Sequence, residues 1–256
     1  MFDHCVVSNK AQLGEQVVVG VGTVIYDNVR IGDQTVIGDH CSIGTPYDGQ
    51  LDDRLLEIGH SSRIRSHTVL YEGSRFREGL EVGHHALIRE RTVAGKCLRL
   101  GSFCDVEGDC SFGDYVRCHS YVHVGKASTV GSFVWLYSLV TLTNDPIPPS
   151  DVERGVVLED GVVVCIGSTV LPGTRMATGA YAAAGTMVRG EVAPGVIVSG
   201  ANCESAGHVA TLADLETGLR HPWMRHFGSH YPEEAQEAIR KLGETIESSR
   251  FTKETE

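Results

Sequence analysis

Apolar side chains recur at every sixth residue along most of the chain. The first run is aliphatic at each step and consists of Val7, Leu13, Val19, Ile25, Ile31, Ile37 and Ile43. A second run holds fifteen apolar positions between Ile58 and Leu142 without an exception. Because 41% of the chain is hydrophobic, fifteen successive hits have a chance probability on the order of one in a million. The period is therefore a property of the fold.

A second set of small or apolar residues follows each anchor by four positions. Two inward positions in every six residues predict a short flat strand and a tight corner. A third block continues the spacing, with glycines at 161, 167, 173, 179 and 185. Neither helices nor β-sandwiches have this period, so the pattern predicts an all-β solenoid.

Two insertions and a C-terminal segment depart from the repeat. The insertions span residues 45–57 and 143–159, and such segments are where a solenoid can build specificity. After the repeat, Glu233 and Glu234 follow Pro232 as in a first helical turn, and Ala235, Ala238, Ile239, Leu242 and Ile246 recur at helical spacing. We predict a β-helix domain over residues 1–203 and a helical extension over 204–256.

The segments VRIGDQTVIGDHCSIG and VVVCIGSTVLPGTRMATGAYAAAGTMVRGEVAPGVIVSG resemble the hexapeptide-repeat acyltransferases. This resemblance implies a left-handed parallel β-helix with three hexapeptides in each coil. It also implies acetyl-CoA or another acyl-CoA as co-substrate and a homotrimer with a groove between subunits. The segments VGHHALIRE and TNDPIP resemble nucleotide-sugar N-acetyltransferases of this family, which implies an amino-sugar acceptor.

Composition excludes several other classes of protein. The formal net charge is −11 and the 22 Lys and Arg residues are scattered, which argues against a nucleic-acid partner. No apolar run is long enough for a membrane span, and the start of the chain lacks the pattern of a signal peptide, so we expect a cytoplasmic protein. The eight cysteines form no CxxC pair, and Cys41, Cys104, Cys110 and Cys118 lie at inner repeat positions, which predicts free thiols.

Acyl transfer needs a base to remove the proton of the acceptor, and histidine suits that role near neutral pH. His84 and His85 occupy outward positions of one repeat. His67 precedes His85 by one coil of the resembled fold, so we expect these two rings to stack. We predict that His84 or His85 is the base and that Glu90 or Asp145 orients it.

Outward polar residues of neighbouring repeats complete the predicted acceptor site. They are His67, Tyr71, Glu72, Arg89 and Asn144. We expect this cluster and the two adjacent histidines to share one edge of the solenoid. For coenzyme A, the resemblance implies the small residues of the later coils, and the residues that match are Gly167, Ala183, Gly185 and Arg189.

Three alternatives stay open. The acceptor group can be a hydroxyl, as in the O-acetyltransferases of the family. His119 and His123 raise a second alternative, a zinc carbonic anhydrase of the γ type. However, the usual His-x4-His element would need a histidine at the position of Cys118 or Val124, so we expect no metal. A non-catalytic scaffold is the third alternative.

Overall fold

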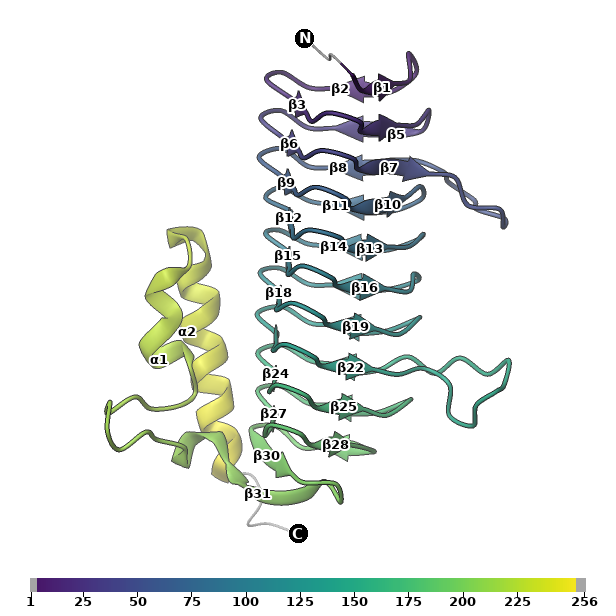
Figure 1. Cartoon of the computed structure of the whole chain (residues 1–256). Coiled ribbons are helices and arrows are strands. Elements are labelled where there is room, and N and C mark those ends of the chain that lie inside the picture. The colour runs from purple at the N-terminus through teal and green to yellow at the C-terminus, as the bar shows by residue number, and fades with distance from the viewer. Residues whose placement is uncertain (1–3, 252–256) are drawn as a thin grey trace.

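Each hexapeptide forms a strand, in most cases of two residues, followed by a corner, and successive repeats turn onto three different faces. The computed structural model describes residues 4–251, which form a parallel β-solenoid and a C-terminal helical segment (Figure 1). Three repeats return the chain to the same face, so strands numbered three apart pair in parallel. The predicted fold, a left-handed parallel β-helix of hexapeptide repeats with a C-terminal helical segment, is confirmed.

The three faces of the solenoid are named sheets A, B and C. Sheet A contains β1 (Val6–Val7), β4 (Val24–Ile25), β7 (Ser42–Thr45), β10 (Val69–Tyr71), β13 (Leu87–Ile88), β16 (Asp105–Val106), β19 (His123–Val124), β22 (Thr141–Leu142), β25 (Thr169–Val170) and β28 (Met187–Val188). Sheet B contains β2 (Gln12–Leu13), β5 (Val29–Ile31), β8 (Leu56–Ile58), β11 (Arg75–Phe76), β14 (Val93–Ala94), β17 (Ser111–Phe112), β20 (Thr129–Val130), β23 (Val157–Leu158), β26 (Arg175–Met176) and β29 (Glu191–Val192). Sheet C contains β3 (Val18–Val19), β6 (Val36–Ile37), β9 (Arg63–Ile64), β12 (Glu81–Val82), β15 (Arg99–Leu100), β18 (Arg117–Cys118), β21 (Trp135–Leu136), β24 (Val163–Val164), β27 (Tyr181–Ala182), β30 (Val196–Ser199) and the antiparallel β31 (Glu204–His208).

Both predicted lattices of inward residues fill the core. From Ile25 onward the anchors are almost fully buried, and Ile43 and Leu70 have no exposed surface; Val7, Leu13 and Val19 in the first coil are partly buried. Buried hydroxyl groups at the second set of inward positions form hydrogen bonds. For example, Thr68 Oγ1 donates to the carbonyl of Gly83 at 2.9 Å. All eight cysteines are free, and the four predicted at inner positions are buried. Burial raises the pKa of Cys104 and of Cys110 to about 11, so both remain neutral thiols.

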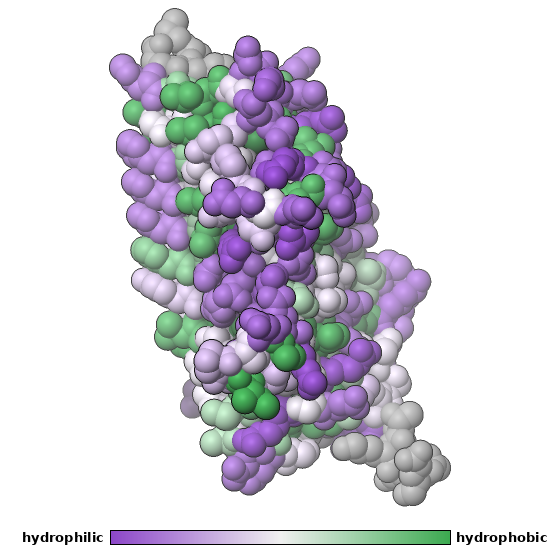
Figure 2. Space-filling view, turned by 90° about the vertical axis from the view of Figure 1, so that its right-hand side faces the viewer, coloured by the Kyte–Doolittle hydropathy of each residue, from purple (hydrophilic) through white to green (hydrophobic). Residues whose placement is uncertain are grey.

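Two edges of the solenoid differ in character. The corner between sheets C and A carries a column of rings, His40, His67, His85, Phe103 and Tyr121, and is called the aromatic edge. The corner between sheets A and B is called the loop edge because both insertions leave it, between β7 and β8 and between β22 and β23. The two loops project to the same side (Figure 1), where hydrophilic residues predominate (Figure 2).

The C-terminal segment contains α1 (Met224–Phe227), α2 (Glu233–Ser248) and the 3-10 turns Val209–Thr211, Gly228–His230 and Ser249–Phe251. The predicted amphipathic helix is confirmed by α2, which buries Ala235, Ile239, Gly243 and Ile246. Its Ile246 packs so closely on the solenoid that a Cβ at Gly179 would lie 2.4 Å from the isoleucine side chain. In residues 4–251, no helix is both long and apolar enough to cross a membrane.

The boundary between domains 1–203 and 204–256 stays a prediction. Strand β31 follows this boundary directly and still pairs with β30 of sheet C. The ends of the two proposed domains, residues 1–3 and 252–256, lie outside the described range.

Candidate functional site

The predicted stacking of His67 on His85 is confirmed at the aromatic edge. Their ring centroids lie 4.6 Å apart with an interplanar angle of 2°. His85 also stacks on Phe103 at 5.0 Å. The neighbouring His84 is exposed like His85, and its backbone N–H donates to Ser102 Oγ at 3.0 Å. Both candidate bases therefore reach solvent, as expected.

Except for His67, the polar residues predicted beside these histidines lie on the loop edge. His85 precedes β13 at the aromatic edge, whereas Arg89 and Glu90 follow β13 at the loop edge. Tyr71 and Glu72 hold the same position one coil earlier, at the end of β10. The expectation of one shared edge is wrong. The four steps from His85 to Arg89 cross the whole width of sheet A, from the aromatic edge to the loop edge.

Glu72 and Glu90 are buried on the loop edge, and arginines bind both. Glu72 is 3% exposed, and its carboxylate accepts hydrogen bonds from Arg54 and from the backbone N–H of Tyr47. Glu90 is 1% exposed and binds the adjacent Arg89, with Arg89 Nη2 3.1 Å from Glu90 Oε1. In the described chain, the Glu90 carboxylate is thus engaged by Arg89 and not by a histidine.

Asn144 and Asp145 begin the second insertion. Asp145 accepts hydrogen bonds from Ile147 N at 3.1 Å and from Ser150 N and Oγ at 2.9 and 2.6 Å. These bonds, of which the one from the Ser150 hydroxyl contributes most, lower the pKa of Asp145. The carbonyl of Asn144 accepts the N–H of Arg154, which closes the loop. The Asp145 carboxylate therefore shapes its own loop.

Sheet A carries a histidine–carboxylate pair that the sequence analysis did not identify. Asp105 in β16 and His123 in β19 are partners in the parallel register, and Asp105 Oδ2 lies 3.1 Å from His123 Nδ1. Both side chains are partly exposed, at 43% and 33%. The hydrogen bond that His123 donates to Asp105 raises the pKa of His123 against the opposing effect of partial burial. The separation of 18 residues, one full coil, is the signal that would have found this pair.

His119 does not share this environment. It follows β18 on sheet C, and its ring lies 4.6 Å from that of Tyr137. Burial, followed by the charge of Arg117, lowers its pKa. Within residues 4–251, no three His, Cys, Asp or Glu side chains are grouped closely enough to hold a metal ion.

The residues predicted for coenzyme A divide between the two edges. Gly167 and Gly185 lie on the aromatic edge with φ near +67°, and a Cβ at either glycine would meet nothing within 4 Å. Ala183 lies beside them after β27. Arg189 follows β28 on the loop edge and donates a hydrogen bond to the carbonyl of Ala201. The roles assigned to these four residues, and to the predicted acceptor site, stay predictions.

Comparison with known proteins finds curated relatives and similar solved structures. No family model matches it. It is 29% identical over 181 residues to the bifunctional protein GlmU of Geobacillus thermodenitrificans, which covers 70% of this chain and 37% of that protein. A second bifunctional protein GlmU, from Exiguobacterium, is 29% identical over 185 residues, covering 70% and 38%. The chain thus spans less than half the length of these curated relatives.

Similar solved structures include the UDP-N-acetylglucosamine acyltransferase of Arabidopsis, at a TM-score of 0.48 and 15% identity, covering 100% of this chain and 98% of that chain. The UDP-N-acetylglucosamine acyltransferase of Campylobacter jejuni has a TM-score of 0.46 and 13% identity, covering 96% and 82%. The predicted resemblance to hexapeptide-repeat acyltransferases is confirmed.

Proposed function

We propose that this protein transfers an acyl group from a coenzyme A thioester to the amino group of a nucleotide-linked amino sugar. The resemblance to nucleotide-sugar N-acetyltransferases supports the two substrate classes. The pairing of His123 with Asp105 is the observation that carries the proposal, because it provides an oriented base on an open face.

The hydrogen bond to Asp105 defines the chemistry of the imidazole. Since a carboxylate oxygen can only accept, His123 Nδ1 carries the proton and donates it, which leaves Nε2 as the acceptor. Nε2 would take the proton of the neutral amine as its nitrogen attacks the thioester carbonyl. When the carbon–sulfur bond breaks, the imidazolium returns this proton to the departing thiolate of coenzyme A.

The aromatic edge offers space for the acyl donor near this base. His123 lies in β19, and Gly167 and Gly185 lie at the corners that precede β25 and β28. Parallel strands are about 4.8 Å apart, so these corners are about 10 and 15 Å from the level of His123. Because glycine has no side chain, an extended pantetheine arm can lie along these two corners.

The experiment measures release of free thiol from a panel of acyl-CoA donors, with nucleotide amino sugars and their hydroxyl analogues as acceptors. We expect thiol release that depends on an amino sugar. His123→Ala should lower kcat about 10²- to 10⁴-fold with little change in melting temperature. Hydroxyl acceptors that react as well would replace N-transfer by O-transfer, and no release with any pair would refute the proposal.

Two further variants compare this base with the one predicted from sequence. His84→Ala and His85→Ala should retain most of kcat, because neither ring has a carboxylate partner in the described chain. If either substitution abolishes turnover and His123→Ala does not, the base lies on the aromatic edge, as first predicted.

We also propose that the chain assembles as a homotrimer, which supplies a second wall for a site on an outer face. The aromatic edge supports this proposal because Phe103, Tyr121 and Leu139 are 47%, 54% and 56% exposed. Light scattering should return three times the chain mass of 27.6 kDa. A monomer at micromolar concentration would contradict the assembly.

A further inference from the structure

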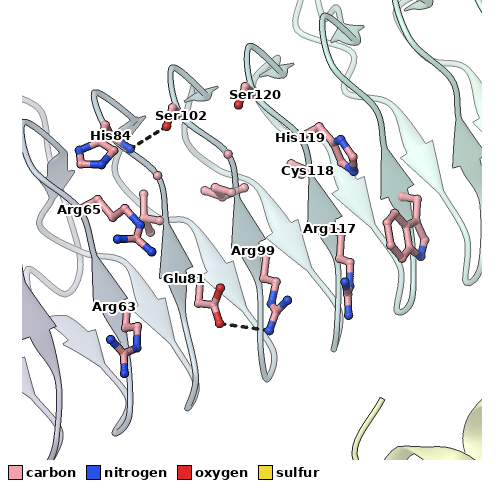
Figure 3. Close-up of a pocket in the computed structure, with 15 residues that line it drawn as sticks. Arg63, Arg65, Glu81, His84, Arg99, Ser102, Arg117, Cys118, His119 and Ser120 are labelled. Carbon is pink, nitrogen blue, oxygen red and sulfur yellow. Dashed lines mark hydrogen bonds and ion pairs between the residues drawn. The ribbon is translucent and has the colours of Figure 1, made fainter. Parts of the chain in front are cut away.

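A groove of about 400 Å³ crosses the outer face of sheet C and is lined by basic side chains. Arg63, Glu81, Arg99 and Arg117 occupy the same register position in β9, β12, β15 and β18. Figure 3 shows them in a row across the strands, with Arg65 beside them. Parallel strands are about 4.8 Å apart, so the four side chains form a closely spaced ladder.

Most of the positive charge in this groove is not neutralised by the protein. Glu81 pairs with Arg99 at 3.1 Å. Within residues 4–251, Arg63, Arg65 and Arg117 form no ion pair with a carboxylate. The chain as a whole carries a formal charge of −11, so this cluster is a local exception. A concave surface lined by unpaired arginines favours an anionic ligand.

Aromatic side chains, two of them from the C-terminal segment, position Arg117 in the groove. The guanidinium carbon of Arg117 lies 4.8 Å from the ring centroids of Trp135 and Tyr231 and 5.7 Å from that of Phe227. Trp135 belongs to β21, whereas Phe227 and Tyr231 come from the helical segment. Three rings therefore hold one guanidinium in place, which reduces the entropy lost when it binds a ligand.

An aromatic pocket of about 240 Å³ continues the groove beyond Trp135. The Trp, Tyr and Phe residues that line it are Trp135, Tyr137, Tyr181, Trp223 and Phe227. The buried indole nitrogen of Trp223 has no hydrogen-bond partner among residues 4–251, so a residue lining this pocket retains an unused donor. Burial, followed by the charge of His226, lowers the pKa of His221 to about 4, so the His221 imidazole is neutral near neutral pH.

We propose that the groove and the pocket together bind a nucleoside diphosphate group, with the phosphates on the arginines and the base between the aromatic rings. The two spaces share Trp135, and His119 of the groove lies 4.6 Å from Tyr137 of the pocket. Guanidinium groups bind phosphate through paired hydrogen bonds, and aromatic faces stack on planar bases. Together the volumes fall within the range of about 300–1,000 Å³ typical of small-molecule sites.

Two sources could supply this group: a nucleotide sugar or the phosphorylated adenosine diphosphate of coenzyme A. The inference does not depend on acyl transfer, because binding is measured directly and neither Asp105 nor His123 lines the groove. A failure of this inference would therefore leave the proposed activity to be judged by thiol release alone.

The chain reports binding through its own fluorescence, because both of its tryptophans, Trp135 and Trp223, line the aromatic pocket. The full chain is titrated with UDP, coenzyme A, uridine and inorganic diphosphate, and each titration is repeated by calorimetry. We expect a saturable change with UDP or coenzyme A, with uridine and diphosphate at least about tenfold weaker, because each fills half the site. Tighter binding of UDP assigns the site to the sugar nucleotide, and tighter binding of coenzyme A assigns it to the donor.

A matched pair of arginines tests the location. Arg99→Ala should weaken binding at least about tenfold, since a charge-assisted contact to phosphate is lost. Arg30 holds the equivalent outward position on sheet B, with 49% exposure and a pair to Glu57 at 3.3 Å, against 47% and 3.1 Å for Arg99 with Glu81. Arg30→Ala should leave binding unchanged. Equal losses in the two variants, an unchanged affinity in Arg99→Ala, or no heat with either nucleotide would overturn the proposal.

Discussion

The carboxylate of Glu72 holds the first insertion against the solenoid, and its removal should release that loop. Arg54 and the backbone N–H of Tyr47 both lie in the insertion and donate to this carboxylate, the second at 3.0 Å. Asn28 Nδ2, in the coil before the insertion, approaches the same carboxylate at 3.3 Å. Glu72 itself is 3% exposed, so its carboxylate forms these hydrogen bonds in a site that is shielded from water. Glu72→Gln keeps the shape of the side chain and removes its charge.

The exposure of the two partners determines how much free energy the Glu72→Gln substitution costs. Breaking a buried ion pair by changing one partner costs about 3–5 kcal/mol. Arg54 is 43% exposed and regains water when released, so the cost falls to about 2 kcal/mol. That free energy raises the population of the open loop about 30-fold, and trypsin should cleave after Arg54 faster by the same factor. Mass spectrometry of the fragments identifies this cut among others.

The control is Glu57→Gln, which changes an exposed carboxylate paired with Arg30 at 3.3 Å. An exposed pair is worth about 0–1 kcal/mol, so cleavage after Arg54 should rise less than about fivefold. If Glu72→Gln leaves cleavage at the control level and instead weakens acceptor binding, Glu72 contacts substrate, as the sequence predicted. Its assignment as the anchor of the loop would then be wrong.

Three further predictions concern the base, the docking of α2 and the pH dependence of stability. Asp105→Asn should lower kcat and move the acid limb of the rate profile to lower pH, because the contact that raises the pKa of His123 is lost; an unmoved limb would contradict this. Gly179→Ala should destabilise the protein about 1–3 kcal/mol more than Gly190→Ala in urea denaturation, because both glycines have φ near +67° but only the first Cβ would meet α2; equal losses would contradict close packing. For His221, whose pKa falls to about 4 on folding, the unfolded chain binds the proton first as pH drops below about 6.5. Stability should therefore fall by about 2 kcal/mol between pH 7 and 5, and His221→Phe should remove that part of the pH dependence.

The repeat predicts the core of this protein because burial depends on position within each hexapeptide. Ile25, Ile31 and Ile37 belong to three different sheets, yet each is almost fully buried. The position of α2 follows from the same kind of evidence, since Ile239 and Ile246 recur on one helical face and both are buried. In both cases the local sequence period determines which side chains are buried. These positions can therefore be predicted without knowledge of long-range contacts.

The pocket formed by the C-terminal segment has no such local signal. Trp223 and Phe227 meet Trp135 of β21 across the surface of sheet C, with ring centroids 6.0 and 5.4 Å away. This contact depends on how a non-repeating segment returns to the solenoid, which the repeat does not specify. Hydrophobic side chains at 223 and 227 predict only that this segment packs against something.

The arrangement of polar residues on the surface follows a longer period than the core. Three repeats return the chain to one face, so neighbours on the outside are 18 residues apart, as in the pairing of Asp105 with His123. His85 and Arg89 are only four residues apart but lie on different edges. An insertion adds its own length: the nine extra residues of the first loop separate His40 from His67, and their rings still stack at 5.2 Å. Candidate pairs on this solenoid must therefore be sought at 18 residues plus any insertion between them, and the printed sequence then gives Asp105 as a neighbour of His123.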